Sequence, residues 1–186
     1  VSVTGTNKSG KVTFASFISH KQSHGVPIIS PAHRIGAMGY TTRIFSQRIG
    51  ASFSPKIQGD FWLRFADNEM TFIGEASNSY LLMPNAHFTF ALKDNFTLHT
   101  KLGYTEWFAE TSSEHNRLLR PEIWGVMKVN DKHHLTFGVD YAQHTFTRSK
   151  VLEESQGNTG IFVQDNFLLS DKITIDGAIR VDLPDN

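Results

Sequence analysis

The sequence predicts an all-β protein, an antiparallel up-and-down meander that forms part of an outer-membrane β-barrel. Large apolar residues alternate with polar ones along most of the chain, which is the period of a β-strand. The chain has 15 Phe among 186 residues, many beside Thr, Ser, Gly or charged residues. The longest aliphatic run is Leu81–Met83, far short of the roughly 18 apolar residues of a membrane helix. Short polar turns also alternate with longer polar connections along the chain. This puts the short turns at one end of the strands and the long loops at the other, as in a membrane barrel.

Composition narrows the possible functions. The 18 basic residues balance the 18 acidic ones, which argues against a nucleic-acid partner because phosphate binding needs a basic face. The absence of Cys excludes disulfides and thiolate chemistry. We expect residues 1–186 to form a single β-meander, and the polar start, Val1–Gly10, contains no apolar leader segment.

The N-terminal half contains the less regular strands, and the first clear hairpin follows it. Phe88–Leu92 alternates, Lys93–Asn95 forms a polar turn, and Phe96–Tyr104 alternates again, as a hairpin requires. Its Phe and Leu side chains fall on one face, while Thr97, His99 and Lys101 fall on the other. The earlier expected strands are Val12–Ile18, Gly36–Phe45, Ala51–Ile57, Phe61–Phe65 and Met70–Ala76.

The C-terminal half repeats the pattern in four longer strands. Leu135, Phe137, Val139 and Tyr141 share one face of the second strand, and the polar residues share the opposite face. The expected strands are Glu122–Val129, His134–Arg148, Gly160–Phe167 and Ile173–Asp182.

The connections alternate between short and long. Short turns are expected near Gln47-Arg48, Asp67-Asn68, Lys93–Asn95, Asn130–Lys132 and Ser170–Lys172. Long loops are expected at His20–His33, Asn78–Pro84, Ala109–Arg120 and Ser149–Thr159. This layout, with long strands, favours a membrane barrel. A soluble β-sandwich or a lipocalin-like barrel shows the same alternation and stays an alternative.

Aromatic residues near strand ends are expected to form an interfacial girdle. Tyr104, Trp107, Trp124 and Tyr141 lie toward the ends of expected strands. Amphipathic rings of this kind favour the boundary between lipid and water.

Residues Lys132–Asp182 resemble a segment in the barrels of TonB-dependent outer-membrane receptors. Gly160–Phe167 contains the aromatic-Val-Gln-Asp strand of that family as Phe162-Val163-Gln164-Asp165. A short turn follows, and the next strand ends in Ala178-Ile179-Arg180-Val181-Asp182, similar to the Gly-x-Arg-x-Asp ending of the family. The preceding segment, His133–Tyr141, is similar to the hairpin that comes before this pair.

This resemblance implies a sector of a receptor barrel in the bacterial outer membrane. Such receptors import a scarce nutrient, such as siderophore iron, a vitamin or a glycan, with energy from the TonB protein, which binds a plug domain. We find no plug-like or TonB-binding segment here, and the family's aromatic-terminated last strand is absent from Leu183–Asn186. The family barrel has 22 strands, against eight to eleven expected here. The partners implied are the nutrient, TonB through the absent plug, and outer-membrane lipid. Open sheet edges make self-association plausible. The alternatives are a small autonomous outer-membrane pore or adhesin, and a soluble ligand-binding β-barrel.

The polar face supplies the candidate binding residues. In a barrel it faces the lumen, where such residues contact ligand or plug, or simply pair with one another. Arg180 with Asp182 or Asp165 is the expected ion pair of the lumen wall. The candidates are His99, Lys101, Asp140, His144, Gln164, Asp176, Arg180 and Asp182.

No catalytic, metal or cofactor site is expected. His133 and His134 are adjacent in an expected turn and would point in different directions, while His20, His24 and His33 share a loop without a fixed scaffold. Asp140 and His144 share a face but lie about 13 Å apart along a strand, too far for a hydrogen bond. We therefore expect no enzyme.

Overall fold

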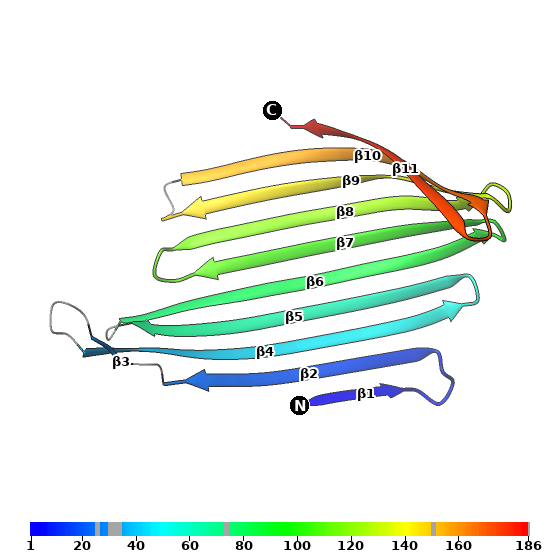
Figure 1. The fold of residues 1–186 in the computed structure, drawn as a ribbon. Coiled ribbons are helices and arrows are strands. Elements are labelled where there is room, and N and C mark those ends of the chain that lie inside the picture. Colours follow the sequence, from blue (N-terminus) through cyan, green and yellow to red (C-terminus); the bar gives the residue numbers. More distant parts are fainter. Residues whose placement is uncertain (25–26, 30–34, 73–74, 150–151, 186) are drawn as a thin grey trace.

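The computed structural model describes residues 1–24, 27–29, 35–72, 75–149 and 152–185 (Figure 1). They form one antiparallel sheet. Its strands are β1 (Ser2–Thr6), β2 (Val12–Ser23), β3 (Pro27–Ile29), β4 (Ile35–Ser54), β5 (Ile57–Phe72), β6 (Glu75–Lys93), β7 (Phe96–Ala109), β8 (Glu114–Lys128), β9 (His133–Arg148), β10 (Leu152–Ser170) and β11 (Ile173–Pro184).

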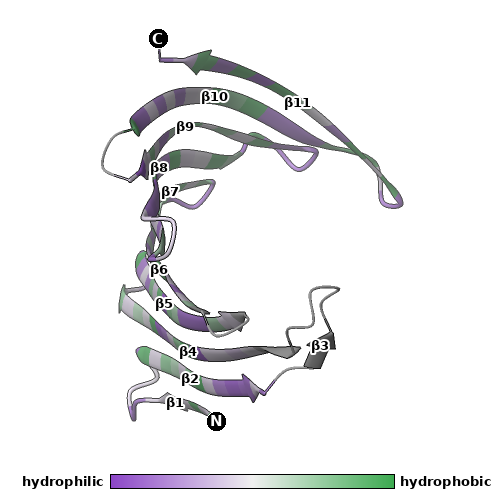
Figure 2. Cartoon of the chain, turned by 90° about the vertical axis from the view of Figure 1, so that its left-hand side faces the viewer, coloured by the Kyte–Doolittle hydropathy of each residue, from purple (hydrophilic) through white to green (hydrophobic). Residues whose placement is uncertain are grey.

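The order of the strands in the sheet follows the order of the chain, so the predicted up-and-down meander is confirmed. Along the main path each strand pairs with the next, from β1 and β2 to β4 and on to β11. The short β3 lies off this path and pairs with the start of β4. Seen along the strands, the sheet curves into an open C (Figure 2). Within the described residues β1 pairs with β2 alone and β11 with β10 alone, so the ring is not closed.

Several strands are much longer than a membrane crossing requires. β4 has 20 residues, and β6 and β10 have 19 each, whereas about 9–11 residues suffice to cross a bilayer. The turns expected at Gln47-Arg48 and Asp67-Asn68 are therefore wrong, because β4 and β5 continue through them. The loop expected at Asn78–Pro84 is also wrong, since these residues belong to β6.

All connections at one end of the sheet are short, as predicted for the side of tight turns. They span two to five residues, from 55–56 to 7–11. In the longest of them Gly10 has φ 70°, a conformation that side-chain-free glycine adopts easily.

The opposite end differs from the sequence-based expectation. The connection expected at 109–120 is reduced to residues 110–113, and β10 already begins at Leu152, so most of the expected loop at 149–159 is strand. In the first long connection, β2 continues to Ser23, and His33 lies outside the described residues. The polar residues taken for loops instead form long hairpins.

The sheet has no hydrophobic core of its own. Among the described residues, Ala66 is the buried apolar side chain and Asp140 is the buried polar one. Large apolar side chains are exposed instead, including Ile161, Ile179 and Val181 with 52%, 68% and 53% of their surface accessible. A single sheet with one exposed apolar face needs lipid or another layer against it.

The exposed apolar side chains form a belt on one face. Cross-strand register places Leu102, Ala86, Phe61, Ile49 and Phe14 in a single row. Toward the turns, similar rows contain Phe88, Phe137, Val163 and Ile179. The described residues contain no helix long and apolar enough to cross a membrane.

Candidate functional site: the polar face of the sheet

All eight residues predicted for the lumen wall lie on one face of the sheet. Register places Lys101 opposite Glu122, Glu122 opposite Asp140, Asp140 opposite Gly160, and Gly160 opposite Asp182. A neighbouring row contains His99, Trp124, Gly138, Phe162 and Arg180. Because directly opposite residues share a face, and so do alternate residues of a strand, His144, Gln164 and Asp176 fall on the same side. We call this the polar face.

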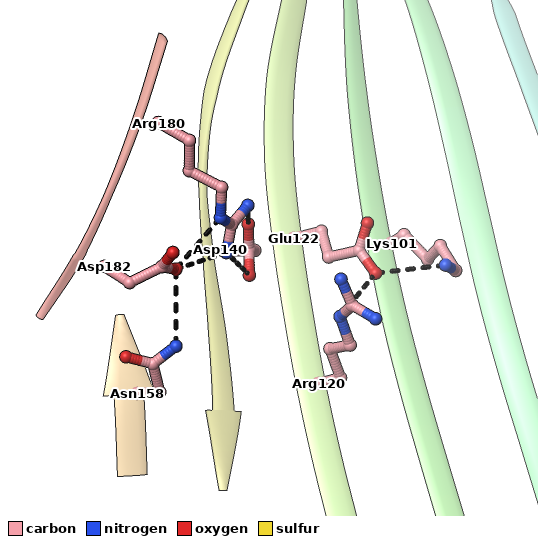
Figure 3. A network of polar contacts seen from close by, with 7 residues as sticks. All are labelled: Lys101, Arg120, Glu122, Asp140, Asn158, Arg180 and Asp182. Atoms are coloured by element: carbon pink, nitrogen blue, oxygen red, sulfur yellow. Dashed lines mark hydrogen bonds and ion pairs between the residues drawn. The ribbon is translucent and has the colours of Figure 1, made fainter. Parts of the chain in front are cut away.

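The centre of the polar face is an ion-pair network formed by β9, β10 and β11 (Figure 3). Arg180 Nη1 lies 2.6 Å from Asp140 Oδ2, and Nη2 lies 3.0 Å from Oδ1. The same guanidinium binds Asp182 through Nε at 2.9 Å, and Asn158 donates to that carboxylate at 3.3 Å. Only 7% of the Asp140 side chain is exposed. The expected pair with Asp182 is present, whereas Asp165 lies on the opposite face.

A second group of charges lies beside it on β7 and β8. Lys101 Nζ lies 3.0 Å from Glu122 Oε1, and Arg120 Nε lies 3.2 Å from the same oxygen. Together the two groups hold three cations and three anions, so the network is neutral and nearly every charge has a partner (Figure 3). Paired charges of this kind are suited to a wall that faces water or another polar domain.

The remaining candidates do not join the network. Asn166 Nδ2 donates to Asp176 Oδ1 at 2.6 Å, near the short turn of the last hairpin. His144 lies farther along β9, beside Phe146 and opposite Gln156. Along the strands Gln164 lies between the levels of Asp176 and His144, in the cross-strand row that also contains Thr97 and Thr136. The polar face is thus continuous, and of the eight candidates Lys101, Asp140, Arg180 and Asp182 belong to the two charge groups.

A cluster of rings on β6, β7 and β8 was not predicted from the sequence. His87 Nε2 lies 3.3 Å from His99 Nδ1, and Trp124 stacks with both rings at centroid distances of 5.4 and 4.9 Å. His87 and Trp124, with Trp62 and Lys101, border a shallow groove. The predicted turn at 93–95 contained the needed signal, because folding the chain back there brings residues 87 and 99 onto neighbouring strands.

Two of the four residues predicted for the aromatic girdle lie on the apolar face. Tyr104 and Tyr141 lie on the apolar face in adjacent rows, where the outward residues change from Phe, Leu and Ile to polar types. Trp107 and Trp124 lie on the polar face, so their assignment to the girdle is wrong. Alternation decides this, since each is an odd number of residues from an outward-facing neighbour on its own strand.

Beyond Tyr104 the hairpins carry polar residues on both faces. On the outward side Glu106 accepts hydrogen bonds from Tyr104 at 2.9 Å and Tyr80 at 3.2 Å, and it also contacts His115 Nε2. Burial by itself raises the pKa of Glu106, but the bonds from His115, Tyr104 and Tyr80 outweigh it and leave the pKa below its ordinary value. Since lipid cannot satisfy such groups, the hairpins leave the membrane here.

No protein-family model matches the sequence, and no curated protein sequence matches it. Among solved structures, the siderophore receptor PirA from Pseudomonas aeruginosa superposes with a TM-score of 0.73 at 14% sequence identity, over 98% of this chain and 32% of that one. A Pseudomonas aeruginosa FadL homologue superposes with a TM-score of 0.53 at 8% identity, over 97% of this chain and 59% of that one.

These two structures support the architecture. Both are bacterial outer-membrane β-barrel proteins, in agreement with the predicted fold. The chain spans about a third of the length of the receptor, and its sheet follows part of that barrel wall. At these identities the likeness concerns the fold, so ligand and energy source are inferences.

Proposed function

We propose that this chain is a sector of an outer-membrane receptor barrel that takes part in TonB-dependent import of a scarce nutrient. The nutrient classes are siderophore iron, a vitamin or a glycan, and no enzymatic step is involved. The observation that carries the proposal is the superposition of nearly the whole chain on part of the wall of a siderophore receptor. The residues of the resemblance, Lys132–Asp182, form the last two hairpins of this chain's sheet, β9–β10 and β10–β11.

The charge pattern of the two faces supports this role. The outward belt is apolar, as lipid requires, and the inward face is a neutral network centred on Asp140 and Arg180. A wall with satisfied charges can face a water-filled lumen or a folded plug without leaving a charge unpaired. Contact with TonB would then be made by the plug and not by the described residues.

A small autonomous outer-membrane barrel is the second candidate. The match to the FadL homologue, over 97% of this chain, favours an outer-membrane barrel of some kind. An autonomous barrel needs its first and last strands paired, since an open edge exposes unpaired backbone groups. In the described residues β1 and β11 have no contact with each other, which favours the sector. A soluble ligand-binding β-barrel is disfavoured, because the Phe-rich face of the described sheet is not covered by another layer.

The proposal is tested by nutrient uptake in cells that lack the full-length protein containing this chain. Radiolabelled ferric siderophores, cobalamin and oligosaccharides are offered to the deletion strain and to the complemented strain, each with and without functional TonB. We expect one class to enter only when both the protein and TonB are present. Uptake that needs the protein but not TonB would support a passive barrel. No loss of uptake for any class would overturn the transport role.

A further inference from the structure

Two histidines of adjacent strands direct ring nitrogens at each other on the polar face. His87 Nε2 of β6 and His99 Nδ1 of β7 are 3.3 Å apart, and the ring centroids are 5.4 Å apart. The hydroxyl of Thr89 lies 3.2 Å from the same Nδ1 atom. Both histidines belong to regular strands whose register is fixed by the tight turn at 94–95, so the backbone holds the pair in place.

The spacing of the two nitrogens fits a shared metal ion. An ion held by two imidazoles at about 2.0–2.1 Å with tetrahedral angles places the nitrogens about 3.3 Å apart and the ring centres about 5 Å apart. The observed 3.3 and 5.4 Å are close to these values, and a bound ion would replace the hydrogen bond that the two nitrogens share. Imidazole nitrogen is a good ligand for copper, nickel and zinc ions.

We propose that His87 and His99 form an open two-histidine site for a divalent metal ion such as Cu²⁺, Ni²⁺ or Zn²⁺. In the described part of the chain no group of three or more His, Cys, Asp or Glu side chains is placed to hold a metal. The protein therefore supplies two ligands, and the other coordination positions are left for water or for donor atoms brought by a bound molecule. An open site of this type binds exchangeably, because half of its ligands are not fixed by the fold.

The nearest charges are compatible with a cation. Lys101 lies opposite His87, but its ammonium is paired with Glu122 at 3.0 Å. On the other side Asp60 lies opposite His87, and Arg48 Nε holds its carboxylate at 2.8 Å. Stacking on Trp124 restrains both rings, which lowers the entropy lost when an ion orders them.

The test measures Cu²⁺ and Zn²⁺ binding to the full-length protein in detergent, purified through a tag without histidine. Isothermal titration gives stoichiometry and affinity, and electron paramagnetic resonance reports nitrogen ligands to Cu²⁺. We compare the wild type with His87→Gln, His99→Gln and the double variant. His144→Gln is the matched control, because His144 lies on the same face two strands from His99.

We expect one ion per chain, with affinity falling at least tenfold in each single variant and unchanged in the control. Equal binding by the wild type and the double variant would overturn the site. A difference in electrophoretic migration between heated and unheated samples confirms that each variant is folded. A second measurement needs no histidine change: Cu²⁺ at the pair quenches Trp124, and Trp124→Phe removes most of the quenching. Absence of quenching at one equivalent of Cu²⁺ also counts against the site. Neither measurement depends on transport.

Discussion

Arg180 on β11 and Asp140 on β9 form a two-pronged ion pair across the strand that separates them. Their two contacts are 2.6 and 3.0 Å long. The guanidinium passes over β10 at Gly160, where an added Cβ atom would lie within 2.0 Å of Arg180 Nη2. The missing side chain is therefore what lets the arginine reach a nearly buried carboxylate. The ion pair therefore connects β11 to β9 across β10.

Replacing Gly160 by Ala is expected to destabilise the barrel by displacing the Arg180 guanidinium. The methyl group would occupy its place, and Asp140 would lose part of its compensation, at a cost of about 1–3 kcal/mol. The measurement is urea unfolding of the full-length protein in detergent or lipid, followed by tryptophan fluorescence.

Gly177→Ala is the matched control for this substitution. An added Cβ at Gly177 meets nothing within 4 Å, and the residue lies on β11, three positions before Arg180. We expect its stability to stay within about 0.5 kcal/mol of the wild type. Equal losses for both glycines would show that Gly160 has no special role beneath the arginine.

Removing Arg180, whose partner Asp140 is nearly buried, is expected to cost more stability than removing Arg48, whose partner Asp60 is more exposed. Arg180→Ala leaves Asp140, 7% exposed, without its cation, and should lower the unfolding midpoint clearly below that of the wild type. Arg180→Lys keeps the charge without the two-pronged geometry and should cost less. Arg48→Ala removes a similar two-pronged pair with Asp60, but Arg48 is 66% exposed, so its loss should cost about 0–1 kcal/mol. Similar unfolding midpoints for the Arg180→Ala and Arg48→Ala variants would contradict this ranking.

Neighbouring residues of β10 should respond oppositely to a positive charge. Val163 lies on the apolar face, so Val163→Arg exposes a guanidinium to lipid and should cost about 2–4 kcal/mol near the bilayer midplane. Gln164 is the next residue and lies on the polar face, so Gln164→Arg should change stability little. Unfolding in lipid vesicles measures both. A larger loss for Gln164→Arg would mean that the faces are assigned the wrong way round.

The pKa of Glu106, lowered in the folded protein, predicts an acid-sensitive contribution to stability. A carboxyl with a lowered folded-state pKa stabilises fully above its ordinary value of 4.5 and loses that contribution as the pH falls through the folded-state pKa. Glu106→Gln should therefore be less stable than the wild type near pH 7, with the difference shrinking in acid. Unfolding is followed from pH 7 to pH 3, with Glu153→Gln on the same end of the sheet as control. A difference that stays constant with pH would rule out this titration.

The sequence by itself determined the face on which each side chain lies. Strand alternation has a period of two residues, so it is legible without knowing any partner strand, and it placed His99, Asp140, Gln164 and Arg180 on one side correctly. The lengths of the strands were less legible. Asp67-Asn68 and Asn78-Ser79 resemble turn residues, although they belong to hairpins that continue into water beyond the membrane.

Only the tertiary structure decided which side chains meet. Register and sheet curvature are set by many cross-strand contacts at once, and a shift of one residue would exchange the two faces. The sequence offered Asp165 as a partner for Arg180, although alternation with Gln164 puts Asp165 on the opposite face. The fold instead provides Asp140, through the space above Gly160. The approach of His87 to His99 depends in the same way on the exact pairing of β6 with β7.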